Sequence, residues 1–221
     1  MVTLKVSIVL PPFMEVQERI LQKATDLFMH FGIRSITMDE IALQLGMSKK
    51  TIYHFFADKN ELADAVTMKM LDHNRDCCEA QRSEAKNAIH QIFMAMEMMQ
   101  DMFENMNSSM LYDLKRYHPK AYERFLEHKY KYLHRITKEN LERGIKEELY
   151  RPDISINIIT LLRLESMMLP FSPNVFSRSK FSLAEVHRHI MEHFLFGIAS
   201  LKGYKLIQKY KEEGKKKTLL S

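Results

Sequence analysis

The residues best suited to chemistry lie between Ser48 and Lys59. Ser48 precedes a short predicted helix that carries Lys49 and Lys50, and residues 48–57 contain no acidic side chain. Free backbone N–H groups at a helix N-terminus bind phosphate oxygens, and Ser48 and Lys49 add a hydroxyl and a positive charge there. Lys50 can donate to guanine O6 and N7, and Thr51 can contact a base edge or a thymine methyl. These properties are typical of a helix that enters the major groove of DNA.

Four further residues extend this candidate DNA-contacting set. Tyr53 can reach a phosphate through its hydroxyl, and Lys59 can pair with the flanking DNA backbone. His54 lies one turn from Lys50 on the outer face, and Thr37 stands at the start of the preceding helix. Each residue also has an ordinary interpretation. Paired lysines are usual on a solvated helix face, His54 can be a plain surface histidine, and Tyr53 can belong to the core.

Three helix-start signals must position these side chains. Thr37 and Glu40 form a capping box, in which the hydroxyl and the carboxylate each satisfy a free backbone N–H. The same spacing recurs at Asp58 and Glu61, and Ser48 is the N-cap of the helix between them. The sequence therefore predicts two short helices followed by the start of a long one.

The two short helices are joined through Gly46–Ser48, which is the arrangement of a helix-turn-helix. At 3.6 residues per turn, the second helix places its apolar residues on one side and its lysine and histidine on the other. We expect the apolar side to pack against the first helix and against Phe28. The inward-facing residues are Ile52, Phe55 and Phe56, and their expected partners are Ile41 and Leu45.

The rest of the chain also reads as helical. Only 6 glycines and 6 prolines occur in 221 residues, and none of the prolines lies between residues 13 and 118. Apolar residues recur at spacings of three and four, which predicts an all-α protein of nine to ten helices without a strand hairpin. The expected helices span 14–31 (ended by Gly32), 38–45, 49–56, 59–79, 85–106, 109–116, 120–148, 154–169 and 183–202, with a break at Gly203 before a lysine-rich final helix.

Several functional classes are excluded by spacing and composition. The six glycines are too far apart for a dinucleotide-binding G-x-G-x-x-G turn or a phosphate-binding P-loop. Cys77 and Cys78 are adjacent, which indicates no disulfide framework and suits a reducing cytoplasm. No stretch reaches the ~20 apolar residues of a membrane span. We expect residues 1–13 to be a disordered arm or the product of a wrongly chosen start codon.

The net charge of +5 is not a DNA-binding signal in itself. Residues 202–221 hold seven lysines and two glutamates, while the remaining 201 residues are neutral overall. We expect this tail to be a solvated final helix, with a nonspecific role at DNA or a membrane surface as the alternative.

Three segments taken together closely resemble the N-terminal DNA-binding domain of the tetracycline-repressor (TetR) family. They are Thr37-Met-Asp-Glu-Ile-Ala42, Gly46-Met-Ser-Lys-Lys-Thr-Ile-Tyr-His-Phe-Phe56 and Asp58-Lys-Asn-Glu-Leu62. Ala24–Phe28 resembles the first helix of that domain, and the similarity covers residues 16–66. The resemblance implies a homodimeric one-component regulator with a variable helical ligand domain. It also implies DNA contacts at Ser48, Lys49, Thr51, Tyr53, His54 and Lys59. The family often has a small residue where this chain has Lys50.

The resemblance divides the chain into an arm (1–13), a helix-turn-helix domain (14–60), a ligand-binding and dimerisation domain (61–203) and a basic helix and tail (204–221). The segment 193–203 resembles the last bundle helix of some family members. In those proteins this helix and a helix equivalent to 155–169, taken from both protomers, form a four-helix dimer interface. The predicted interface residues are Ile159, Leu162, Val186, Ile190, Phe194 and Ile198.

Methionines are dense in the middle of the chain, where seven of the 17 lie between residues 94 and 110. Flexible thioether side chains suit a pocket for varied apolar ligands, and they suit a plain core equally well. The candidate pocket residues are Met98, Met102, Met110, Tyr112, Tyr130 and His134.

The rival interpretation is an enzyme. His189, Glu192 and His193 match the H-x-x-E-H pattern of inverted zinc peptidases, in which two histidines bind zinc and the glutamate acts as a general base. The pattern is short, no third ligand emerges, and the same helix is needed as an apolar interface. We therefore predict a cytoplasmic repressor of a palindromic DNA operator, without catalytic residues, metal or cofactor, that a small apolar ligand releases. The remaining alternative is a regulator that does not respond to a ligand.

Overall fold

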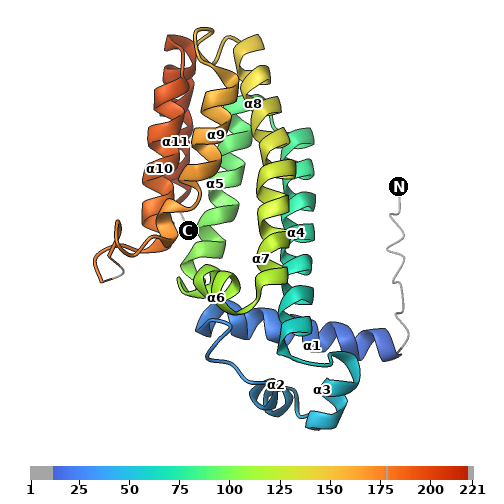
Figure 1. Cartoon of the computed structure of the whole chain (residues 1–221). Helices are drawn as coiled ribbons and strands as arrows, with labels where there is room; N and C mark the ends of the chain where they lie inside the picture. The colour runs from blue at the N-terminus through green and yellow to red at the C-terminus, as the bar shows by residue number, and fades with distance from the viewer. Residues whose placement is uncertain (1–11, 178, 219–221) are drawn as a thin grey trace.

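A computed structural model describes residues 12–177 and 179–218 of the chain (Figure 1). Helix α1 (Pro12–Phe31) begins two residues before the predicted start. Most of the predicted N-terminal arm lies outside the described residues. The described part of the chain has no helix that is both long enough and apolar enough to cross a membrane.

An N-terminal unit (residues 12–58) contains α1, α2 (Met38–Leu45) and α3 (Lys49–Phe55) and lies at one end of the molecule (Figure 1). The predicted capping box is present. The backbone N–H of Thr37 donates to Glu40 Oε2 over 2.6 Å, and the N–H of Glu40 donates to Thr37 Oγ1 over 3.1 Å. Gly46 ends α2 at φ 63°, a left-handed conformation that favours glycine.

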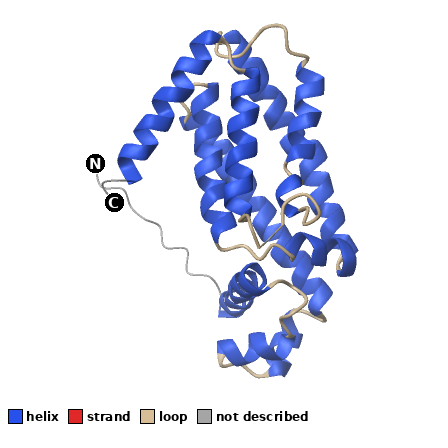
Figure 2. Ribbon diagram, turned by 90° about the vertical axis from the view of Figure 1, so that its left-hand side faces the viewer, coloured by secondary structure: helices blue, strands red, loops and turns tan. Residues whose placement is uncertain are grey.

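The remainder forms a bundle (residues 59–218) of roughly parallel and antiparallel helices (Figures 1 and 2). No strand occurs among the described residues, and one isolated bridge joins Tyr150 to Ala199. The all-α prediction is confirmed. The bundle helices are α4 (Lys59–Glu84), α5 (Ala88–Glu104), α6 (Met110–Tyr117), α7 (Pro119–Glu127), α8 (His134–Lys146), α9 (Ile156–Ser166), α10 (Leu183–Ile198) and α11 (Leu201–Thr218), with a 3₁₀ turn at Leu169–Phe171.

The predicted long helix at 120–148 is present as one continuous rod. It begins at Pro119, and α7 passes through a π-helical turn (His128–Leu133) directly into α8. This turn brings His128 and Lys129 into the protein interior. A π turn is uncommon, and such turns gather at functional sites.

The two largest errors in the predicted helix ends are in α4 and α10. Helix α4 continues to Glu84, five residues beyond the prediction, and α10 ends at Ile198 instead of residue 202. The break lies at Ala199, whose extended backbone pairs with Tyr150, and Gly203 falls inside α11. A Cβ on Gly203 would stand 2.0 Å from the carbonyl oxygen of Leu149, so this glycine permits a close crossing and does not end a helix.

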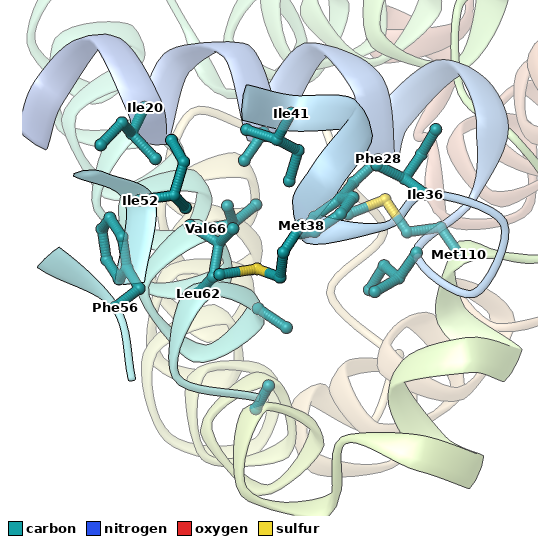
Figure 3. Close-up of a cluster of buried hydrophobic side chains, with 14 of the residues drawn as sticks. Ile20, Phe28, Ile36, Met38, Ile41, Ile52, Phe56, Leu62, Val66 and Met110 are labelled. Carbon is teal, nitrogen blue, oxygen red and sulfur yellow. The ribbon is translucent and has the colours of Figure 1, made fainter. Parts of the chain in front are cut away.

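The N-terminal unit and the bundle share one apolar core. Phe28, Ile41 and Ile52 from the N-terminal unit belong to the same buried cluster as Met110 and Leu114 from α6 (Figure 3). Figure 3 also shows Leu62 and Val66 of α4 reaching into this cluster. The N-terminal unit is therefore seated on the bundle and not held by a single linker.

One polar contact crosses the same junction, and others join α4 to α7 within the bundle. The carboxylate of Asp64 on α4 accepts from Arg124 Nε over 2.6 Å and pairs with Lys120 Nζ at 3.0 Å. These two cations hold the pKa of Asp64 below its usual value although burial opposes them. Asp113 on α6 accepts from the backbone N–H of Arg34 over 3.0 Å.

Candidate nucleic-acid interface and ligand cavity

Helix α3 has the two faces that the sequence predicts. Ile52 is fully buried and Phe56, just after the helix, is nearly so, which fixes the helix against the N-terminal core. Lys50, Tyr53 and His54 are exposed on the outer side. A helix anchored on one side and bearing exposed donors on the other has the geometry for insertion into a DNA groove.

Ser48 and Thr51 organise the start of α3. Ser48 Oγ accepts from the backbone N–H of Thr51 over 3.1 Å, and the two hydroxyls lie 2.8 Å apart. Thr37 has the same role at the start of α2, where its hydroxyl also donates to Glu40 Oε2 over 2.9 Å. The hydrogen bonds from Thr37 also lower the pKa of Glu40. These hydroxyls hold the helix starts in place, and the first N–H groups of α3 stay at the surface.

Lys49 is exposed and already poised beside an anion. Its Nζ lies 2.7 Å from a carboxylate oxygen of Asp39 on α2 and 5.8 Å from the ring centroid of Tyr53. The hydrogen bond and charge of Asp39 raise the pKa of Lys49. An exposed pair of this kind contributes little to stability, so the ammonium group can exchange Asp39 for a phosphate at small cost.

Lys59 is placed differently from the other predicted contacts. The side chain is half-buried, and its Nζ donates to the backbone oxygen of Arg34 over 3.3 Å. Burial lowers the pKa of Lys59. The amine therefore closes the turn between α1 and α2 in this structure, whereas the sequence assigned it to the flanking DNA backbone.

A cavity of about 110 Å³ lies inside the bundle, between α4, α5, α8, α9 and α10. Apolar side chains form most of its wall, and a few polar groups face it. The lining residues are Cys78, Gln81, Gln91, Ile92, Ala95, Leu133, Ile136, Thr137, Asn140, Leu141, Arg163, Met167, Met191 and Phe194.

None of the six predicted pocket residues lines this cavity. Met98 comes nearest, since its sulfur lies 3.7 Å from Nε2 of the lining residue Gln81. Met102 packs in a separate cluster around Phe103 at the end of α5, and Met110 is buried in the core shared with the N-terminal unit. The other three are exposed or half-buried: Tyr112, Tyr130 and His134.

The sequence missed the residues that do line the cavity because nothing local marks them. Arg163, Gln91 and Asn140 come from three helices, and only the packing of those helices brings them together. A methionine-rich segment signals flexible packing, and it gives no indication of which face of α5 meets α8 and α9.

The predicted dimer residues divide into two groups. Val186 and Ile198 are buried within the protomer, while Leu162 is 59% exposed. Ile159, Ile190 and Phe194 are half-buried. Helix α9 also exposes Ile158 and Leu161 next to Leu162, so the apolar surface available to a partner is centred on α9.

The residues of the rival zinc pattern do not converge on a site. Glu192 pairs with Lys211 Nζ at 2.8 Å and with Arg188 at 3.7 Å, which occupies the carboxylate that a general base would need. His189 Nε2 lies 3.3 Å from a guanidinium nitrogen of Arg188. Within residues 12–177 and 179–218, no group of three histidine, cysteine or acidic side chains is arranged to hold a metal ion.

Comparisons with known proteins agree with this geometry. Residues 20–66 match the model of "Bacterial regulatory proteins, tetR family". The chain is 24% identical over 192 residues to the uncharacterized HTH-type transcriptional regulator YvaF of Bacillus subtilis (strain 168), covering 83% of this chain and 95% of that protein. Each of these matches describes a regulator, and neither describes an enzyme.

Solved structures share the fold across most of the chain. A TetR-family regulator from Agrobacterium tumefaciens has a TM-score of 0.69 at 14% identity, covering 85% of this chain and 100% of that one. A regulator from Saccharomonospora viridis, solved in complex with choline, has a TM-score of 0.67 at 16% identity, covering 85% and 99%. The matched helix-turn-helix segment is therefore that of TetR-family DNA-binding transcriptional regulators, and the helical bundle behind it has the fold of solved TetR-family structures.

Proposed function

We propose that the protein is a cytoplasmic, homodimeric repressor that leaves a palindromic operator when a small, largely apolar ligand enters the bundle. The observation that carries this proposal is the outer face of α3, where Lys50, Tyr53 and His54 are exposed while Ile52 fixes the helix from behind. Two such helices, one from each protomer, enter successive major grooves. The free thiols of Cys77 and Cys78 suit the reducing cytoplasm.

In this proposal the residues around α3 divide into two roles. Ser48, Lys49 and Tyr53 contact phosphates, and Lys59 joins them if its bond to the Arg34 carbonyl opens. The residues that contact base edges are Lys50, Thr51 and His54. Thr37 orders the start of α2 through its capping box and thereby holds Asp39 beside Lys49.

The dimer forms through α9 and α10 in the same proposal. Exposed Ile158, Leu161 and Leu162 on α9 form the apolar surface that a second protomer covers. Val186 and Ile198 support α10 from the inside of the bundle. Ile159 and Ile190 lie at the edge of this surface, where their half-buried side chains become covered on association, and half-buried Phe194 supports it from the cavity wall.

Helix α4 connects the cavity to the DNA-contacting helix α3 in this proposal. It begins beside α3 at the Asp58 N-cap and reaches the cavity at Cys78 and Gln81. A ligand that fits the cavity better in one arrangement of α4 favours the dimer state in which the two α3 helices are wrongly spaced. Its effect is limited by its difference in affinity between the two states.

Selection of bound sites from random DNA tests the DNA-binding part of the proposal. We expect an inverted repeat whose half-sites are centred about one helical turn apart, or a multiple of it. Lys50→Ala should change the enriched bases, because Lys50 is assigned to base contacts. Enrichment of a single, asymmetric half-site would contradict a symmetric dimer.

Salt dependence tests the phosphate contacts. Lys49→Ala should reduce the slope of log K against log salt concentration by about 0.9 for each phosphate that a half-site no longer neutralises. Lys131→Ala, at an exposed lysine of the bundle, is the matched control and should leave the slope unchanged. An unchanged slope for Lys49→Ala would remove this residue from the interface.

A further inference from the structure

Arg163 of α9 is a buried cation that faces the bundle cavity. The residue is 8% exposed and lines the cavity together with Met167, Met191 and Phe194. Its Nη1 donates to Ser166 Oγ over 3.4 Å, and its guanidinium carbon lies 5.8 Å from the ring centroid of Phe194. Among the described residues no carboxylate pairs with this guanidinium.

Lys129 gives an internal comparison. Its side chain is 3% exposed, yet its Nζ lies 3.1 Å from Glu165 Oε1, so the charge is balanced. Arg163 has no such balance, and burial lowers its pKa to about 10, which still leaves it charged at neutral pH. A buried charge without a partner is costly, and binding of an anion would relieve that cost.

The other polar groups on the cavity wall are neutral. Gln91 Oε1 accepts from Asn140 Nδ2 over 2.9 Å, and Tyr150 donates to Asn140 Oδ1 over 3.0 Å, so these amides are held in fixed orientations. Gln81 and Thr137 add an amide and a hydroxyl, and no aspartate or glutamate is among the lining residues. The wall therefore offers donors and a positive charge to a ligand, surrounded by apolar side chains.

We propose that the effector is a small carboxylic acid with an apolar body, bound as the carboxylate against Arg163. This inference rests on the proposed ligand-responsive function and names the chemical class of its ligand. A guanidinium matches a carboxylate with two parallel hydrogen bonds, and the aliphatic and aromatic wall covers the remainder of the molecule. A cavity of about 110 Å³ fits a body no larger than a single ring, and the flexible side chains of Met167 and Met191 can make room for a short chain.

Calorimetric titration of the full-length protein tests the ligand class. The probes are sodium benzoate and sodium octanoate, with benzyl alcohol and octan-1-ol as neutral partners of the same shape and benzylamine as the cation. We expect at least one carboxylate to bind at least about tenfold more tightly than its alcohol, and benzylamine not to bind. Equal affinities for acid and alcohol, or binding of the amine alone, would overturn the proposal.

Three variants locate the binding. Arg163→Met keeps the volume and removes the charge, so it should weaken carboxylate binding at least about tenfold and leave alcohol binding unchanged. Arg188→Met, at a half-exposed arginine of α10 outside the cavity wall, is the matched control. Should Arg163→Met fail to fold, Ala95→Phe narrows the cavity from α5 and should abolish the binding of acid and alcohol alike. Full carboxylate affinity in Ala95→Phe or in Arg163→Met would overturn the assignment.

Fluorescence anisotropy with the selected operator distinguishes a wrong ligand class from a wrong function. Tight operator binding without affinity for any carboxylate refutes the carboxylate inference and leaves the DNA-binding regulator standing. Carboxylate binding that depends on Arg163 but does not change operator affinity supports the inference and refutes the ligand response of the proposed function.

Discussion

The N-terminal unit and the bundle differ in how completely their buried polar atoms are hydrogen-bonded. In the N-terminal unit, Thr37, Ser48 and Asp58 each cap a helix by accepting from a backbone N–H three residues further on. In the bundle, His128 Nδ1 and Thr160 Oγ1 are buried without a hydrogen-bond partner among the described residues. Buried side-chain atoms without a hydrogen-bond partner therefore occur in the bundle and, among the described residues, not in the N-terminal unit.

This difference suits the two tasks that we propose, DNA contact and ligand response. A DNA-contacting helix must keep one shape, and short-range caps fix the starts of α2 and α3. A ligand domain must exist in two states of similar energy, and an unbalanced group such as Arg163 makes the energy of the bundle depend on what fills the cavity. We therefore expect the two regions to respond differently to substitution.

The largest expected effect tests whether the two regions unfold together. Phe28→Ala removes a fully buried ring from the core that α1 shares with α6, and it should lower the free energy of unfolding by about 3 to 5 kcal/mol. Because the core is shared, hydrogen exchange should show weaker protection in α6 as well as in α2 and α3. Phe31→Ala, at an exposed ring of the same helix, is the control. Weaker protection confined to α1–α3 would mean that the N-terminal unit folds separately.

A second prediction concerns a glycine that the bundle needs for space. Gly144 lies in α8 against the ring of Tyr150, and a Cβ there would stand 2.0 Å from the Cδ2 atom of that ring. Gly144→Ala should destabilise the protein by about 1 to 3 kcal/mol, because overpacking outweighs the gain of about 1 kcal/mol in helix propensity. Thermal unfolding followed by circular dichroism measures the change. A more stable Gly144→Ala variant would show that Tyr150 can move aside.

These contrasts also explain what the sequence could predict. The caps at Thr37, Ser48 and Asp58 are local patterns, so the positions of α2 and α3 follow from residue types a few places apart. The cavity depends on how α5, α8 and α9 pack, and no local pattern distinguishes Arg163 from an ordinary surface arginine. The same limit explains the wrong prediction at Gly203. The sequence indicated a helix end there, whereas the glycine lets α11 pass close to the backbone of Leu149.

A third prediction uses the buried histidines of the bundle. Burial lowers the pKa of His187 to about 4, with a further contribution from the charge of Arg163, and burial likewise lowers the pKa of His128 to about 4. The unfolded chain takes up these protons near pH 6.5, before the folded protein does, so stability present above pH 6.5 is lost as the pH falls towards 4. Each histidine should contribute a loss of about 1 to 2 kcal/mol between pH 7 and pH 5.

His187→Gln should remove the contribution of one histidine, about 1 to 2 kcal/mol, from the loss of stability between pH 7 and pH 5. Urea unfolding at pH 7 and pH 5 gives the two free energies, and His73→Gln, at an exposed histidine of α4, is the matched control. An unchanged pH dependence in His187→Gln would show that His187 does not stay neutral in the folded bundle.

The smallest expected effect belongs to the N-terminal unit. Gly46 has φ 63° and open space around its Cβ position, so its requirement is purely conformational, in contrast to the steric requirement at Gly144. Gly46→Ala should cost about 1 kcal/mol, and Gly46→Asn should recover much of it, because asparagine tolerates the left-handed conformation. At Gly144 asparagine should be no better than alanine, since both add the Cβ that strikes Tyr150. Rescue by asparagine at both sites, or at neither, would remove the distinction between a locally specified N-terminal unit and a bundle specified by long-range packing.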